Sequence, residues 1–82
     1  MKLPRDLDGE KLCGLLAKYG YAPTRKTGSH IRLTSSEQGV EHHITIPDHS
    51  PLKTGTVSSI LGDVANYLKI EKKTLIKNLF EL

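Results

Sequence analysis

Apolar residues recur every three or four positions in three segments of the chain, and this spacing predicts helices with one buried face. Between the first two of these segments, apolar and polar residues alternate in short stretches, which is typical of strands. The pattern predicts six elements in the order helix 8–19, strands 21–26, 29–34 and 42–46, and helices 55–68 and 71–80.

Residues at the ends of these segments support the assignment. Asp8 is a favourable N-cap for the first helix, and Gly20 can end it in the left-handed conformation. Pro23 restricts the first strand to the edge of a sheet or to a strand start. We expect Thr54 or Thr56 to cap the second long helix, because a threonine hydroxyl can bind the free N–H groups of a first turn.

Alternation gives each strand two different faces. The apolar members share one face, which we expect both main helices to cover: Ile31, Leu33, Ile44 and Ile46. The polar members share the opposite, open face: His30, Arg32, Thr34, His43 and Thr45. The predicted fold is α+β, with a three-stranded antiparallel sheet and helices on one face. Its order α-β-β-β-α is that of the double-stranded-RNA-binding domain, with a short added C-terminal helix.

Composition narrows the class of protein. Eighty-two residues suffice for one domain, residues 1–82, near the smallest size at which a single core is self-sufficient. The formal charge of +3 indicates only a modest bias toward polyanions. No apolar run is long enough to cross a membrane, the N-terminus lacks a signal-peptide hydrophobic region, and a single cysteine cannot form an internal disulfide. We therefore expect a cytoplasmic protein.

Two polar motifs stand out between these elements. Gly28-Ser29-His30 lies where a loop becomes a strand, and Pro47-Asp48-His49 follows the third strand, with Gly55-Thr56 beyond it. Their order and spacing closely resemble the HicA (YcfA-like) family of small bacterial and archaeal toxins, from about Leu3 to Ile60. The resemblance implies a double-stranded-RNA-binding-domain fold, an mRNA-cleaving endoribonuclease of a type II toxin–antitoxin system, and a HicB-like antitoxin as partner.

RNA carries its own nucleophile, the 2′-hydroxyl beside each phosphodiester. An RNase therefore needs groups that move protons and stabilise negative charge, for which histidine and the basic side chains are suited. The catalytic histidine of the family belongs to Gly-Ser-His, and it corresponds by motif to His30. We expect RNA contacts from Arg25, Lys26, Arg32, His43 and Lys53. This route requires no metal, and we expect no cofactor.

Other roles for the polar residues stay open at this point. His49 is either an acid/base or phosphate contact, or it helps Asp48 to fix the turn into the following helix. A zinc site would need His42 and His43 on one ion, but adjacent strand residues point to opposite faces. Cys13 lies beside an apolar helix stripe, which favours a small packed side chain over a nucleophile.

Two other functions compete with the toxin hypothesis. A noncatalytic RNA-binding module would suit the same fold. Double-stranded-RNA binders, however, usually concentrate lysines where the last main helix begins, and here Lys53 stands alone until Lys69. A protein-interaction domain would use the open sheet face only for docking.

Overall fold

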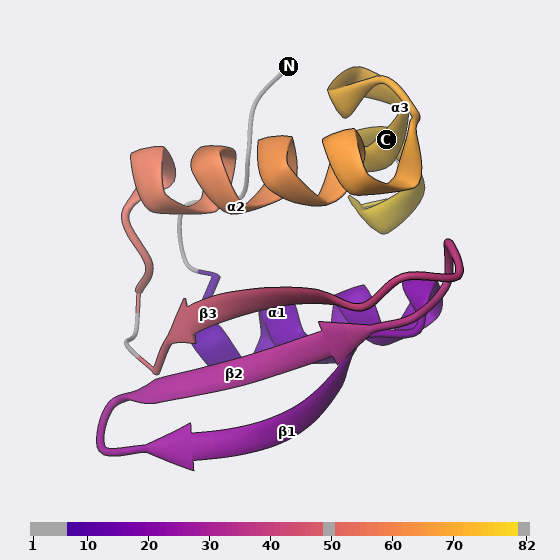
Figure 1. The fold of residues 1–82 in the computed structure, drawn as a ribbon. Coiled ribbons are helices and arrows are strands. Elements are labelled where there is room, and N and C mark those ends of the chain that lie inside the picture. Colours follow the sequence, from indigo (N-terminus) through magenta and orange to yellow (C-terminus); the bar gives the residue numbers. More distant parts are fainter. Residues whose placement is uncertain (1–6, 49–50, 81–82) are drawn as a thin grey trace.

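The computed structural model describes residues 7–48 and 51–80 and has the expected α+β fold. Three antiparallel strands form one sheet with the order β1-β2-β3, and the helices lie together on one of its faces (Figure 1). The elements are α1 (Gly9–Leu16), the 3₁₀ turn η1 (Ala17–Tyr19), β1 (Ala22–Thr27), β2 (His30–Ser35), β3 (His42–Pro47), α2 (Thr54–Leu68) and α3 (Lys72–Phe80).

The first helix begins and ends with the predicted residues, although its last turn is tighter than expected. The carboxylate of Asp8 accepts a hydrogen bond from the Lys11 N–H at 2.7 Å, which caps the first turn of α1. The helix changes to η1 after Leu16, and Gly20 then reverses the chain with φ of 81°. A residue with a Cβ would be strained at that angle, which explains glycine at this turn.

The prediction that a threonine caps the second long helix was wrong. Thr54 is already the first helical residue, and the N-cap is Lys53, which makes no side-chain capping bond. The preceding residue explains the earlier start, because Leu52 is buried and its N–H donates to the Leu7 carbonyl at 2.7 Å. These two contacts fix the chain two residues ahead of the first helical residue.

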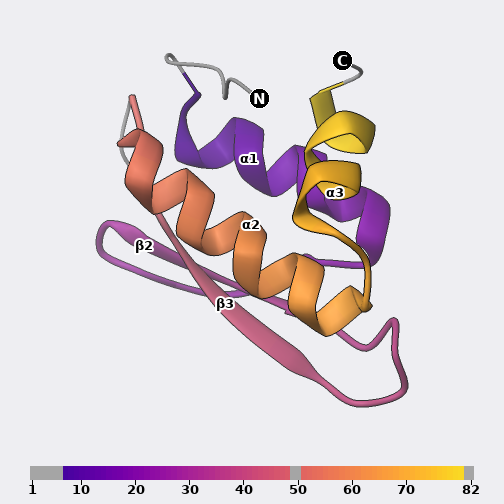
Figure 2. The same ribbon diagram turned by 90° about the horizontal axis from the view of Figure 1, so that it is seen from above.

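One hydrophobic core fills the space between the sheet and the helices. The predicted inward residues of β2 and β3 are all buried, and they meet α1 and α2 on the same face of the sheet (Figure 2). α3 packs against α2 at its C-terminal end (Figure 1) and adds Leu75, Ile76 and Leu79 to the core. Within the described ranges, no helix is long and apolar enough to cross a membrane.

Candidate functional site

The two polar motifs meet at one end of the sheet. His30 begins β2 and lies directly opposite Pro47, the last residue of β3. Asp48 continues this pairing, because its N–H donates to the Ser29 carbonyl at 2.6 Å. Gly28 adopts a φ of 54° in the tight turn before Ser29, as its position in the motif predicts. The described part of the second motif therefore lies beside the first.

The start of α1 holds this junction from the helical side. Gly9 is buried, and a Cβ placed on it would lie only 2.3 Å from the Pro47 carbonyl oxygen. No other residue fits at this contact without moving the end of β3. The first helix thus fixes the position of the strand end that faces His30.

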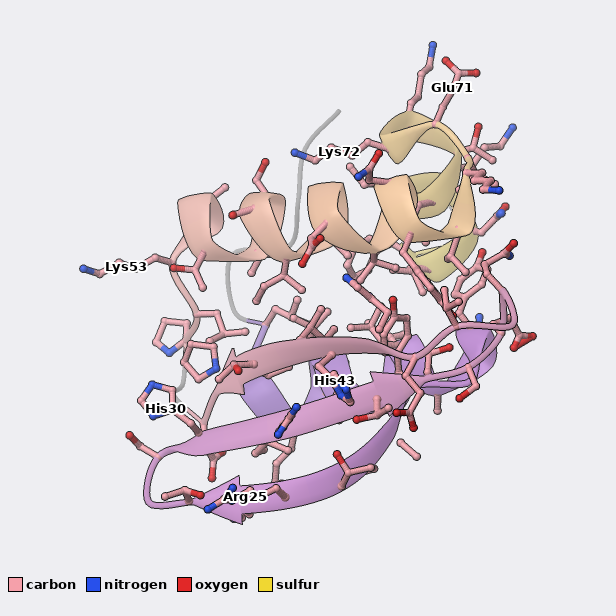
Figure 3. All side chains as sticks on the ribbon, in the orientation of Figure 1. Arg25, His30, His43, Lys53, Glu71 and Lys72 are labelled. Carbon is pink, nitrogen blue, oxygen red and sulfur yellow. The ribbon has the colours of Figure 1, made fainter. Side chains whose placement is uncertain are left out.

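His30 belongs to a basic hollow on the open face of the sheet. The hollow has a volume of about 230 Å³, and its lining residues are Arg25, Thr27, His30, Arg32 and Thr45. Cross-strand pairing brings them together, since Thr27 is opposite His30 and Arg25 is opposite Arg32. The imidazole is exposed to solvent, and Figure 3 shows it near Arg25 toward the same end of the sheet. An anion bound here would contact two guanidinium groups beside an accessible imidazole.

A β-bulge in β1 turns Arg25 toward this face. The register between β1 and β2 shifts between Pro23 and Arg25, which leaves Thr24 as the extra residue. The Thr24 hydroxyl lies 2.8 Å from that of Thr34, so both residues face the open side. Simple alternation through β1 would have placed Arg25 on the helical side. Sequence reasoning missed the bulge, although Pro23 inside a strand was its signal.

The structure does not bring the other predicted basic residues into the hollow. Lys26 lies opposite the buried Ile31, and its ammonium pairs with the Asp48 carboxylate at 3.3 Å. Lys53 stands at the start of α2 and points away from the sheet (Figure 3).

The remaining predicted histidines lie elsewhere. His43 is on the open face, but farther along the sheet, where its Nδ1 lies 2.7 Å from the Thr34 hydroxyl. His49 lies outside the described residues.

Comparison with known protein families decides the relationship suggested by the motifs. A family model described as the HicA toxin of bacterial toxin–antitoxin systems matches residues 9–65. The chain belongs to the HicA toxin family. The matched segment includes every residue that lines the basic hollow, whereas α3 lies beyond it. No curated protein and no solved structure matches the chain.

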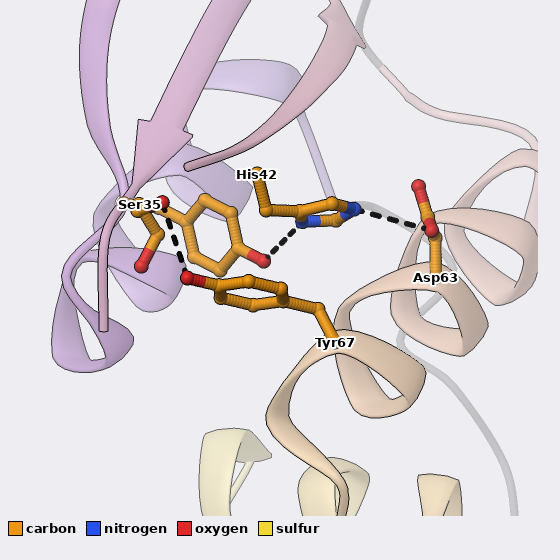
Figure 4. Close-up of polar contacts among 5 residues, drawn as sticks. Ser35, His42, Asp63 and Tyr67 are labelled. Atoms are coloured by element: carbon orange, nitrogen blue, oxygen red, sulfur yellow. Dashed lines mark hydrogen bonds and ion pairs between the residues drawn. The ribbon is translucent and has the colours of Figure 1, made fainter. Parts of the chain in front are cut away.

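His42 differs from its neighbour His43 and forms a polar cluster that sequence reasoning missed. Its Nδ1 lies 2.6 Å from the Tyr21 hydroxyl and its Nε2 lies 3.3 Å from an Asp63 carboxylate oxygen. The ring stacks on Tyr67, with 4.6 Å between ring centroids and 12° between planes (Figure 4). Burial raises the pKa of Tyr21 well above its ordinary value, and Tyr67 and Asp63 raise it further. The phenol therefore stays protonated beside His42 Nδ1, and it donates to that nitrogen when a neutral His42 donates from Nε2 to Asp63.

Tyr67 extends this cluster to the loop between β2 and β3. Its hydroxyl accepts the Gln38 N–H at 3.0 Å and lies within hydrogen-bonding distance of the Ser35 and Val40 carbonyls. The loop is thereby attached to α2. The pair His42-His43 was the sequence signal for this cluster, because alternation along a strand allows only one of two adjacent residues to face the helices. The structure confirms that His42 is partly buried and His43 exposed.

The remaining titratable residues contribute no further site. Within residues 7–48 and 51–80, no three His, Cys, Asp or Glu side chains lie close enough to hold a metal ion. Cys13 is half-buried, and burial together with the nearby Asp48 charge raises the pKa of its thiol above the ordinary value. A raised pKa keeps the thiol protonated and therefore poorly nucleophilic.

Proposed function

We propose that this HicA-family toxin is an endoribonuclease that cleaves mRNA at the basic hollow, with His30 as a catalytic acid or base. One observation carries the proposal: an exposed imidazole lies beside two arginines on the open face of the sheet. Membership of the HicA family supports it, because these toxins act in toxin–antitoxin systems. A sheet face that is merely exposed to solvent would not need an imidazole beside two arginines.

The chemistry follows from RNA itself. The 2′-oxygen attacks the neighbouring phosphorus, the bond to the 5′-oxygen breaks, and a 2′,3′-cyclic phosphate forms. One proton leaves the 2′-hydroxyl and one is gained by the departing 5′-oxygen, and His30 is suited to one of these transfers. Arg25 and Arg32 would stabilise the charge that builds on the phosphate oxygens. His49 remains our candidate for the second proton transfer.

We propose further that the reaction requires no metal ion. The five residues of the hollow include two arginines and a histidine but no carboxylate, a set that favours binding of anions over binding of hard cations. Cleavage should therefore continue in EDTA and leave 2′,3′-cyclic phosphate or 3′-phosphate ends. Loss of activity in EDTA that one specific divalent ion restores would overturn this part of the proposal.

Family membership implies a HicB antitoxin as the protein partner. We propose that the antitoxin covers the open sheet face, because the helices direct most of their apolar side chains inward. Adding a HicB-like partner should perturb the NMR signals of His30, Arg32 and His43. If only the outer faces of the helices respond, inhibition acts from a distance and this assignment is wrong.

Replacement of histidines on the open face tests the catalytic assignment. His30→Ala should abolish cleavage of an mRNA fragment and growth inhibition, whereas His43→Ala should keep most of the activity. His43 is the matched control, because it is exposed on the same face but outside the hollow. A folded His30→Ala protein with the wild-type rate would refute the role of His30. RNA binding by the wild-type protein without any cleavage would favour a noncatalytic RNA-binding module.

A further inference from the structure

A second hollow lies beside His30, on the opposite side from the arginines. Its volume is about 290 Å³, and it lies between the end of β3 and the start of α2, with Pro47, Pro51, Leu52, Lys53 and Thr56 as lining residues. We propose that this hollow binds the base of a nucleotide next to the cleaved phosphate, so that the substrate must be single-stranded at the cut. This inference rests on the proposed endoribonuclease function.

The position of the second hollow follows from strand pairing. Pro47 is the cross-strand partner of His30, and side chains of directly opposed residues lie on the same face about 5 Å apart. The basic hollow extends from His30 toward β1, whereas the second hollow extends from Pro47 toward α2. The His30–Pro47 pair therefore separates a hollow that contains two arginines from one that contains two prolines and a leucine.

This arrangement matches the two chemical parts of a nucleotide. The phosphate is an anion and suits Arg25 and Arg32, whereas a base has two apolar faces and a polar edge. The rings of Pro47 and Pro51 offer carbon surfaces against which a base can pack, with the buried Leu52 beneath them. Thr56 is half-buried in the first turn of α2, where its hydroxyl can bind a base edge. The described lining of either hollow contains no aromatic side chain, so packing here depends on proline and leucine.

The hollow also limits the form of the RNA. Bases of an A-form duplex are paired and stacked inside the helix, and protein side chains do not reach them through the deep major groove. A base can enter the second hollow only when it is unpaired and turned out of the stack. The three-stranded fold would otherwise be compatible with duplex binding, so the hollow makes a distinct prediction.

Abasic and duplex substrates test the inference with the wild-type chain. The probe is a short RNA with one cleavage position, prepared intact, paired to a complementary strand, and with an abasic nucleotide on either side of the cut. We expect pairing to protect the RNA and one of the two abasic nucleotides to lower kcat/KM at least tenfold. Equal cleavage of the intact, paired and abasic RNAs would overturn the base-binding hollow while leaving the endoribonuclease function intact. Absence of cleavage in every RNA would overturn both.

A variant pair then locates the base. Thr56→Val removes the hydroxyl at nearly constant size and should change the order of preference among the four bases at the sensitive position. Thr54→Val is the matched control, since Thr54 is exposed in the same helical turn but does not line the hollow. Circular dichroism checks that both variants fold. Identical base preferences in Thr56→Val, Thr54→Val and the wild type would show that the base binds elsewhere.

Discussion

His30 and His42 lie at opposite ends of the same strand pair, and their surroundings differ sharply. His30 begins β2 opposite the last residue of β3, whereas His42 begins β3 opposite the last residue of β2. His30 is exposed beside two arginines on the open face. The His42 side chain is only 20% exposed, and both of its ring nitrogens have polar partners.

The difference separates the position that we propose to be catalytic from a structural one. A proton carrier needs access to substrate, and the exposed His30 side chain has that access on the open face. His42 is held by Tyr21, Asp63 and the ring of Tyr67, so its nitrogens are occupied in joining the sheet to α2. Histidine thus lies in two different environments at the two ends of the β2–β3 strand pair.

The largest expected effect comes from removing each histidine separately. His30→Ala should lower RNA cleavage by about 10²–10⁴-fold, the usual contribution of a general acid or base, and change the free energy of unfolding by less than about 0.5 kcal/mol. His42→Ala should keep cleavage within a few-fold but lower stability by about 2–3 kcal/mol, because the buried Tyr21 hydroxyl loses its partner and Tyr67 its stacked ring.

Cleavage rates well below the melting temperature and urea unfolding curves measure both quantities. The comparison fails if both variants lose stability equally, or if His42→Ala removes cleavage while the protein is still folded. The first result would give His30 a structural role as well, and the second would place the reactive chemistry at the His42 end.

A smaller loss of stability should follow Tyr67→Phe. The hydroxyl binds the Gln38 N–H and carbonyls of the β2–β3 loop, so its removal should cost about 0.5–1.5 kcal/mol. Tyr19→Phe is the matched control, because that hydroxyl accepts one exposed bond from Asn78 at 3.2 Å. Hydrogen exchange should show faster opening of the loop in Tyr67→Phe alone. Equal melting temperatures for the two variants would mean that the loop does not depend on Tyr67.

Most of the fold could be predicted because period-two and helical patterns directly encode which side is buried. Ile31, Leu33, Ile44 and Ile46 are buried as alternation predicted, and Asp8 caps α1. Two details depended on tertiary contacts instead. The bulge at Thr24 moved Arg25 to the open face, and the buried Leu52 set the start of α2 in place of a threonine cap.

The candidate site was predictable only in part. The motif located His30, and period two placed Arg32 beside it. The prediction that Lys26 joins them was wrong, because Lys26 and its neighbour Arg25 face opposite sides of the sheet. The Asp48 carboxylate that pairs with Lys26 comes from a distant part of the chain, so the sequence did not indicate this ion pair. The structural role of His42 could not be predicted from the sequence, because Tyr21, Asp63 and Tyr67 come together around it only in the folded chain.

The basic residues near His30 provide the next, weaker test. Arg32→Gln should weaken single-stranded RNA binding and reduce the slope of log K against log salt by about 0.7, the value for one lost phosphate contact. Lys26→Gln should leave the slope nearly unchanged, because Lys26 faces the helical side and pairs with Asp48. Filter-binding titrations over a range of salt concentrations measure both slopes. A larger change of slope for Lys26→Gln than for Arg32→Gln would mean that RNA binds on the helical side of the sheet, which would contradict the proposed site.

The smallest effect concerns alkaline pH at the His42 end. Burial raises the pKa of Tyr21 in the folded chain above the pKa of the same tyrosine in the unfolded chain, which is about 10. The contribution of this tyrosine to the free energy of unfolding is therefore complete below about pH 10 and decreases as the pH rises above it, because the unfolded chain then releases the proton while the folded chain retains it. Urea unfolding at pH 10.5 should show a loss of about 1 kcal/mol relative to pH 8 in the wild type, beyond any loss seen in Tyr21→Phe. Tyr21→Phe keeps the ring and its packing, so subtracting its pH dependence isolates the phenol from the lysines that titrate in the same range. Parallel pH curves for the two proteins would mean that the Tyr21 proton is no harder to remove in the folded chain than in the unfolded one.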